Sequence, residues 1–208
     1  LSAWPAVSAK RLLSKAVHAL ILDVATWAPI FRGFTFWVFR YAHRHQIASL
    51  NSISRSENNP VIKREIPDGY RVRPSAAQAR LATSQFGSLD DKFQRRLEIA
   101  RYYHDSLSDI PEIVLPPLRL DGSHGYMTFA IQVPDRDALI GHLFASNRDC
   151  APQHLLNCAD LDCFSEFRRE CPNARAAAES VLLLPTYPRY ARTEAERTVK
   201  AVRSFFGR

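Results

Sequence analysis

The sequence predicts an α+β protein in which a small sheet with covering helices follows a helical segment. Apolar residues recur every three or four positions over residues 86–107, which is the period of a helix. Residues 126–133 alternate between apolar and polar, and residues 181–184 are continuously apolar, as in strands. Lys and Arg outnumber Asp and Glu by 11 to 4 over residues 1–74 but equal them at 17 to 17 over residues 75–208. We therefore expect a basic aromatic helical segment at 1–50, a linker at 51–74 and an α+β domain at 75–208.

Residues 16–41 are largely apolar and aromatic, but Asp23, Pro29, Arg32 and Gly33 interrupt them. A membrane span of about 20 residues would not normally carry these, so we expect two short helices instead. Their aromatic face either packs against protein or lies at an anionic membrane surface. The second alternative uses the basic residues Lys10, Arg11, Lys15, Arg32, Arg40 and Arg44. Because these residues interleave with bulky apolar ones, we do not expect a nucleic acid partner.

The junction at residues 69–81 is predicted to be a loop that turns into a helix. Ser75 and Gln78 have the spacing of a capping box, and Arg71 and Arg73 stand immediately before it. The free N–H groups of the first turn add partial positive charge, so a phosphate would be stabilised here. The alternative is an ordinary capped helix start with two solvated arginines.

The 75–208 domain divides into elements in a defined order. The first helix face is expected to break near Gly87, and strands are expected at 113–116 and 126–133. The second strand should place Phe129, Ile131 and Val133 on one side, together with Met127.

A helix should follow from about Asp135, and an apolar strand should end at Leu184. Thr193 and Glu196 are predicted to form a second capping box, which opens a helix that ends at Gly207.

The four cysteines do not predict a metal site. Cys150, Cys158, Cys163 and Cys171 lack the close Cys-x-x-Cys pairs that present two thiolates to a tetrahedral ion. We expect free thiols in a reducing cytoplasm rather than zinc or a disulfide.

The junction Gly-Tyr-x-x-Arg-x-Ser-x-x-Gln-Ala and the order of elements after it resemble the DegT/DnrJ/StrS family of pyridoxal-phosphate sugar aminotransferases. The resemblance covers residues 69–208. It implies the C-terminal small domain of a fold-type I pyridoxal-phosphate-dependent transferase. It also implies a homodimer whose substrates are a keto-sugar or similar carbonyl compound and an amino donor such as glutamate.

The resemblance also assigns roles to residues. In the family, a Tyr-Asn-x-Arg junction reaches the partner's cofactor phosphate. Arg71 replaces the usual Asn and Arg73 keeps the family residue, so both are expected to bind the cofactor. His154 matches a histidine at the mouth of the active site and is expected on the substrate side, with a surface or packing role as the alternative. Met127 and Gln132 depart from the family, which weakens the expectation of a nucleotide-linked sugar bound in the usual way.

The family's cofactor lysine would lie before residue 1, and no lysine of this chain stands in comparable small, Gly-rich surroundings. Since the chain also begins with Leu1, we expect a fragment that has no catalytic residue of its own and cannot transaminate alone. Two alternatives remain, a non-catalytic relic and a module that binds a membrane surface. A Gly-rich, lysine-bearing sequence upstream would favour the enzyme. The expected location is cytoplasmic, with peripheral membrane contact through 1–50 in the last alternative.

Overall fold

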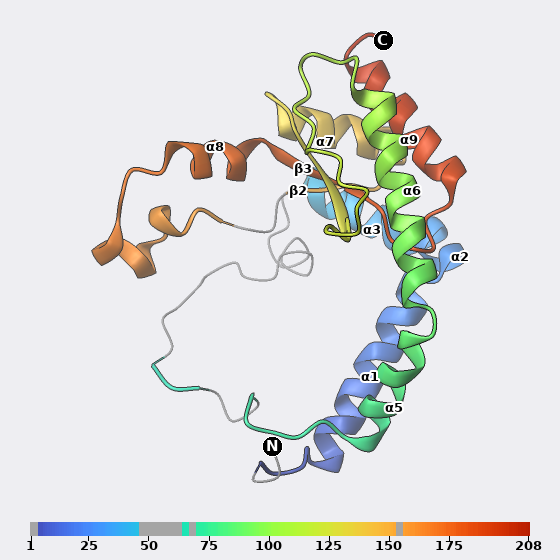
Figure 1. Cartoon of the computed structure of the whole chain (residues 1–208), viewed down its shortest axis with the longest axis vertical. Helices are drawn as coiled ribbons and strands as arrows, with labels where there is room; N and C mark the ends of the chain where they lie inside the picture. Colours follow the sequence, from blue (N-terminus) through green and yellow to red (C-terminus); the bar gives the residue numbers. More distant parts are fainter. Residues whose placement is uncertain (1–3, 46–63, 67–69, 153–155) are drawn as a thin grey trace. The chain divides into compact units, whose positions relative to one another are not determined.

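The computed structural model describes residues 4–45, 64–66, 70–152 and 156–208 (Figure 1). The chain divides into two compact units, Leu1–Phe86 and Gly87–Arg208. The expected linker at 51–74 is described only at 64–66 and 70–74, and its other residues lie outside the described ranges.

The first unit begins with α1 (Ala9–Thr26). Ser8 is its N-cap, since its hydroxyl accepts the Arg11 N–H at 3.4 Å. The helix ends at Trp27, whose ψ of 130° is extended, one residue before Ala28 and Pro29. Ala28, the residue directly before Pro29, is itself helical, so the break between the two helices lies at Trp27.

Three short elements follow this break, namely α2 (Ala28–Ile30), the π-helix η1 (Phe31–Thr35) and α3 (Phe36–Arg44). The Thr35 hydroxyl donates to the Ala25 carbonyl at 2.8 Å and ties η1 to the end of α1. The predicted interruption of the helical segment is therefore confirmed, but the segment forms one helix of 18 residues and three short elements rather than two short helices. Among the described residues, no helix is both long enough and apolar enough to cross a membrane.

The unit closes with α5 (Ala76–Phe86), and α6 (Leu89–Leu107) opens the second unit. The predicted break near Gly87 is confirmed. Only the C-terminal part of the predicted apolar face is buried, at Leu97, Ala100, Tyr103 and Leu107, whereas Phe86 and Leu89 are exposed.

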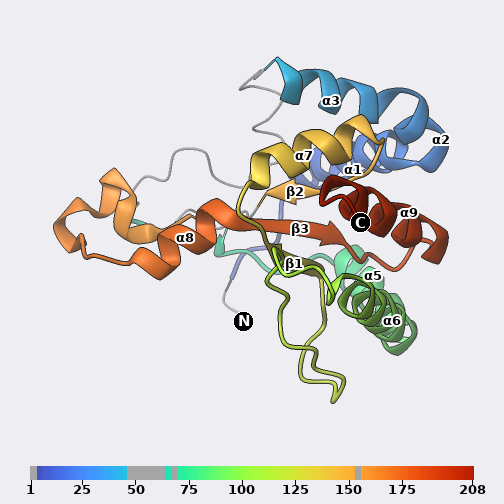
Figure 2. The same cartoon turned by 90° about the horizontal axis from the view of Figure 1, so that it is seen from above.

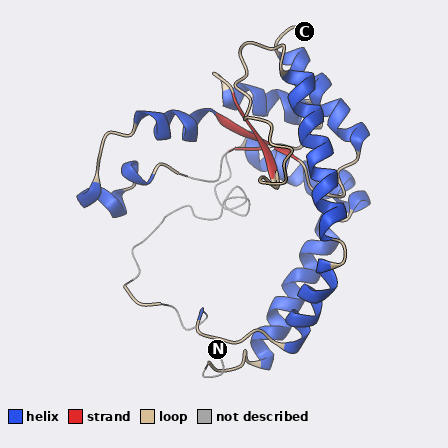
Figure 3. Cartoon of the chain, in the orientation of Figure 1, coloured by secondary structure: helices blue, strands red, loops and turns tan. Residues whose placement is uncertain are grey.

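The second unit contains a three-stranded antiparallel sheet with the strand order β1-β3-β2 (Figures 2 and 3). Its strands are β1 (Thr128–Gln132), β2 (Ala151–Pro152) and β3 (Val181–Pro185). In the β1–β3 register, Phe129 lies opposite Leu184 and Ile131 opposite Leu182. The central strand β3 is buried along its whole length, which explains its continuously apolar sequence.

Three helices form the core with this sheet, and α9 (Arg192–Phe205) lies between α6 and α7 (Arg136–Ala145) (Figure 2). The Tyr103 ring of α6 packs on Phe129 of β1 at 5.6 Å between centroids. At the far end, Arg203 of α9 donates to both carboxylate oxygens of Asp109 at 2.6 and 2.8 Å. The predicted α+β arrangement is confirmed.

The start of β1 is fixed by an unusual residue, Tyr126, whose φ is +39°. Its hydroxyl accepts the Arg119 N–H at 2.6 Å and donates to the Pro117 carbonyl at 3.2 Å. Its carbonyl accepts from the buried Thr186 hydroxyl at 2.6 Å. These contacts hold the left-handed conformation, and the strand begins only at Thr128, so that Met127 is 75% exposed rather than buried beside Phe129.

Two predicted elements are wrong. Residues 113–116 form a single bridge between Val114 and Gln132, with N–H···O distances of 2.9 and 3.0 Å, rather than a strand. Pro116 and Pro117 lack the N–H needed to continue the pairing.

The second capping box is also absent. Ala191 is the N-cap of α9 and makes no side-chain cap, while Glu196 accepts from Arg192 at 3.3 Å. The stop at Gly207 is confirmed, because its φ of +70° closes the helix end and the Arg208 N–H bonds the Arg203 carbonyl at 3.0 Å.

Between β2 and β3 the chain forms two 3₁₀-helices, η4 (Cys158–Asp160) and η5 (Asp162–Phe167), and then α8 (Pro172–Ser180). Arg136 of α7 donates to the Ala178 carbonyl at 2.7 Å and so fastens the end of α8.

Candidate functional site

The junction before α5 forms the capping box that the sequence predicts. The Gln78 N–H donates to the Ser75 hydroxyl at 3.2 Å, and the Ser75 N–H donates to the Gln78 side-chain oxygen at 2.9 Å. The loop that leads into the box is anchored by the Arg73 N–H, which bonds the Pro5 carbonyl at 2.9 Å beside a bridge to Ala6. The reciprocal bonds fix where the helix begins and which amides face outward.

This helix start carries positive potential without a neutralising carboxylate. The first turn of α5 holds no acidic residue, unlike those of α6, α7 and α9. Among the described residues, the amides of Ala76 and Ala77 have no hydrogen-bond acceptor. Arg71 and Arg73 precede them, and both side chains are exposed. Two guanidinium groups beside two open amides can hold a phosphate or carboxylate.

His154 lies outside the described residues. After it, the Asn157 amide donates to Asp160 at 2.8 Å, and the Arg175 guanidinium donates to both Asp160 oxygens at 3.0 and 2.5 Å. The Arg175 hydrogen bonds lower the pKa of Asp160 to about 2. This cluster joins η4 to α8.

The four cysteines are free thiols. Within the part of the chain that the structure describes, no three His, Cys, Asp or Glu side chains come together as metal ligands. Burial raises the pKa of the Cys150 thiol, which is consistent with an unreactive core residue.

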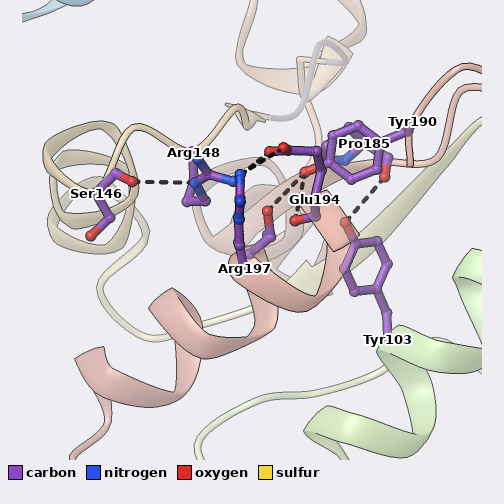
Figure 4. Close-up of polar contacts among 8 residues, drawn as sticks. Tyr103, Ser146, Arg148, Pro185, Tyr190, Glu194 and Arg197 are labelled. Carbon is purple, nitrogen blue, oxygen red and sulfur yellow. Dashed lines mark hydrogen bonds and ion pairs between the residues drawn. The ribbon is translucent and has the colours of Figure 1, made fainter. Parts of the chain in front are cut away.

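A polar network that sequence reasoning missed surrounds the start of α9 (Figure 4). Glu194 accepts from Arg148 at 2.7 Å and from Arg197 at 3.0 Å. Nearby, the hydroxyls of Tyr190 and Thr198 lie 2.8 Å apart, and the Tyr103 hydroxyl donates to the Pro185 carbonyl at 3.2 Å. Burial raises the pKa of Tyr103, so this hydroxyl stays protonated. The network is structural, since it holds α9 against β3 and the end of α7.

A cleft of about 340 Å³ opens next to this network. Its charged lining comes from Arg95 and Glu98 of α6 and from Arg189 and Arg192. The Arg192 guanidinium lies 3.5 Å over the Tyr102 ring. The sequence signal for this cleft was weak, because the α6 residues and the chain before α9 are separated by about 90 positions.

Comparisons with known proteins agree with this fold. The sequence profile of the DegT/DnrJ/EryC1/StrS aminotransferase family matches residues 41–203. The dTDP-3-amino-3,6-dideoxy-alpha-D-galactopyranose transaminase of Aneurinibacillus thermoaerophilus is 30% identical over 138 residues, which cover 66% of this chain and 38% of the relative. The dTDP-4-dehydro-2,3,6-trideoxy-D-glucose 4-aminotransferase of Saccharopolyspora spinosa is 31% identical over 146 residues, covering 64% of this chain and 36% of the relative.

A solved structure is similar as well. DesV from S. venezuelae, in complex with a ketimine intermediate, matches with a TM-score of 0.60 and 25% identity. The match covers 71% of this chain and 41% of DesV. The chain thus spans about two fifths of the length of the curated and solved relatives named here. Since the family profile matches residues 41–203 of 208, this chain belongs to the DegT/DnrJ/EryC1/StrS aminotransferase family.

Proposed function

We propose that this chain is the C-terminal part of a pyridoxal-phosphate-dependent aminotransferase that acts on a keto-sugar or a similar carbonyl compound. The observation that carries the proposal is the family match over residues 41–203, joined to a span of only 36–38% of two curated sugar aminotransferases. The amino donor would be glutamate or another amino acid, and the complete form would be a homodimer. The free thiols support a reducing, cytoplasmic location.

The residues of this chain suit the phosphate end of the cofactor. Arg73 and Arg71 would pair with phosphate oxygens, and the open N–H groups of Ala76 and Ala77 would donate hydrogen bonds to a remaining oxygen. Because the capping box fixes the helix start, the backbone amides are held in place before the anion arrives. In the dimer, the phosphate would be that of the cofactor on the partner subunit. His154 would face the substrate.

Bound pyridoxal phosphate supplies the electron sink for amino transfer, and its enzymes hold it on a lysine that also carries the proton. The lysines of the described ranges do not suit this task. Lys10 and Lys15 are exposed on α1, Lys200 is exposed on α9, and Lys92 stands in the first turn of α6. Lys63 lies outside the described residues. In this proposal the group that carries the proton would belong to a cofactor domain outside this chain, and this part would contribute binding and orientation.

The test compares the chain alone with the same chain joined to a complete cofactor domain. With pyridoxal phosphate and glutamate, the chain alone should transfer no amino group, and borohydride reduction should label no lysine stoichiometrically. Mass spectrometry of the reduced protein measures this labelling. The joined protein should aminate a keto-sugar.

One lysine labelled to completion in the chain alone would contradict the proposal that the cofactor lysine lies outside this chain. A joined protein that binds the cofactor but aminates none of a panel of keto-sugars would contradict the substrate class.

A further inference from the structure

The helix α1 carries an apolar face that the structure leaves open. None of its residues is buried. Five large apolar side chains follow each other at steps of three or four residues, and they are exposed by 67%, 49%, 63%, 49% and 62% at Leu13, Val17, Leu20, Val24 and Trp27. At 3.6 residues per turn these positions fall within an arc of roughly 80°, the width of one face of an amphipathic helix. Ile21, 59% exposed, widens the arc on one side.

The opposite side of α1 is basic. Arg11 and Lys15 are exposed there, on the far side from Leu13 and Leu20. Over residues 4–45 the sequence has six Lys and Arg and a single acidic residue, Asp23. A surface that receives this segment therefore gains electrostatically when it is anionic, whereas a second copy of the same segment would bring like charges together.

Aromatic side chains stand where α1 ends. Trp27 is 62% exposed and Phe34 of η1 is 67% exposed. Indole and phenyl rings with this exposure are suited to the headgroup level of a bilayer, where one side of the ring is apolar and the other wet. The π-helical turn at η1 and the break at Trp27 keep this segment from forming one long helix, and no described helix is suited to spanning.

We propose that α1 docks in the plane of an anionic membrane surface, with its Leu13–Trp27 face among the headgroups and its Arg11 and Lys15 side toward water, while the net positive charge of residues 4–45 attracts the segment to the anionic surface. This surface is separate from the chemistry of the proposed function. An exposed helix of this length is only marginally stable by itself, so covering its apolar face also stabilises it.

The chain offers a matched pair of variants for the test. Leu20→Glu places a charge in the centre of the apolar face. Leu22→Glu makes the same chemical change two residues later on the opposite side, where Leu22 is 46% exposed. Both side chains are exposed and Glu is a good helix former, so both variants should fold, with equal helicity by circular dichroism.

The measurement is co-sedimentation of the full chain with vesicles of phosphatidylcholine and phosphatidylglycerol, and with vesicles of phosphatidylcholine alone. The wild type and Leu22→Glu should bind the anionic vesicles, bind the neutral ones far less, and be released by salt. Leu20→Glu should bind about tenfold or more weakly, because burying a leucine side chain contributes about 1.5–3 kcal/mol.

Failure to bind anionic vesicles, or equal binding by the two variants, would overturn the proposal. Self-association that Leu20→Glu abolishes, without any binding to vesicles, would overturn it in favour of a protein contact. None of these outcomes bears on the transaminase proposal, which the borohydride and amino-transfer assays test separately.

Discussion

Asp149 is the acidic residue whose environment in the second unit is least favourable to charge. It is partly buried between Arg148, which is engaged with Glu194, and the buried Cys150. Loss of water raises the pKa of Asp149 to about 6, although an N–H from Cys150 works in the other direction. In an unfolded chain the pKa of an aspartate is about 3.9. Asp149 is thus a residue whose protonation is linked to folding.

The sign of this linkage gives a prediction. Between about pH 4 and 6 the folded state binds more protons at Asp149 than the unfolded state, so its contribution to stability falls as pH rises. Asp149→Asn should raise the free energy of unfolding at pH 8 by on the order of 1–3 kcal/mol and change it little at pH 4. Urea unfolding at the two pH values measures this. Asp162→Asn, at a fully exposed carboxylate, is the control. A wild-type pH profile in Asp149→Asn would contradict the assignment.

The two predicted capping boxes, of which only one forms, show what local sequence can and cannot predict about a helix start. Ser75 and Gln78 form theirs through two reciprocal hydrogen bonds between neighbours in the sequence. Thr193 and Glu196 have the same spacing, but Tyr190 is held by the Thr198 hydroxyl at 2.8 Å, and α9 starts at Arg192, before the predicted cap. Thr193 therefore lies inside the helix rather than at its cap, and Glu196 accepts from Arg192 instead. The predicted strand at 113–116 fails for a similar reason. The run is apolar, but the two prolines that follow Leu115 cannot donate the hydrogen bonds of a strand, so only the bridge at Val114 forms.

The start of α7 offers the clearest test of an element. Asp135, near which the sequence predicts a helix to begin, is the N-cap of α7 and accepts the Ala138 N–H at 3.0 Å. Asp135→Ala should lower the free energy of unfolding by about 0.5–2 kcal/mol, whereas Asp135→Asn should keep most of the cap. Thermal and urea unfolding of both variants measure the difference. Equal loss in the two variants would show that charge rather than the hydrogen bond stabilises this end.

The candidate site was predictable only where it depends on neighbours in sequence. Arg71, Arg73, Ser75 and Gln78 lie within one stretch of chain, so their pattern predicted the junction that the structure forms. Contacts across 46 or 94 residues, such as Glu194 with Arg148 or Arg203 with Asp109, depend on the whole fold and left no local signal. The family resemblance supplied the order of elements and therefore the sheet, and the profile match extends it back to residue 41.

The two units of the chain correspond to different proposed tasks. Leu1–Phe86 holds the basic apolar helix α1 and the phosphate-binding junction, and Gly87–Arg208 supplies the α+β core. In the proposed dimer, the junction would be the part of this chain that meets the cofactor. Arg73, as the proposed ligand of the cofactor phosphate, is therefore the residue to test.

The most direct measurement is the dissociation constant of pyridoxal phosphate from this chain joined to a complete cofactor domain, for Arg73→Ala and for Arg80→Ala. Both arginines are exposed, but Arg73 precedes the capped start of α5 and Arg80 lies in its second turn. A charge-assisted hydrogen bond contributes about 1.5–3 kcal/mol, so Arg73→Ala should weaken cofactor affinity about tenfold or more while Arg80→Ala leaves it near the wild-type value. Equal affinities for the two variants would contradict the account.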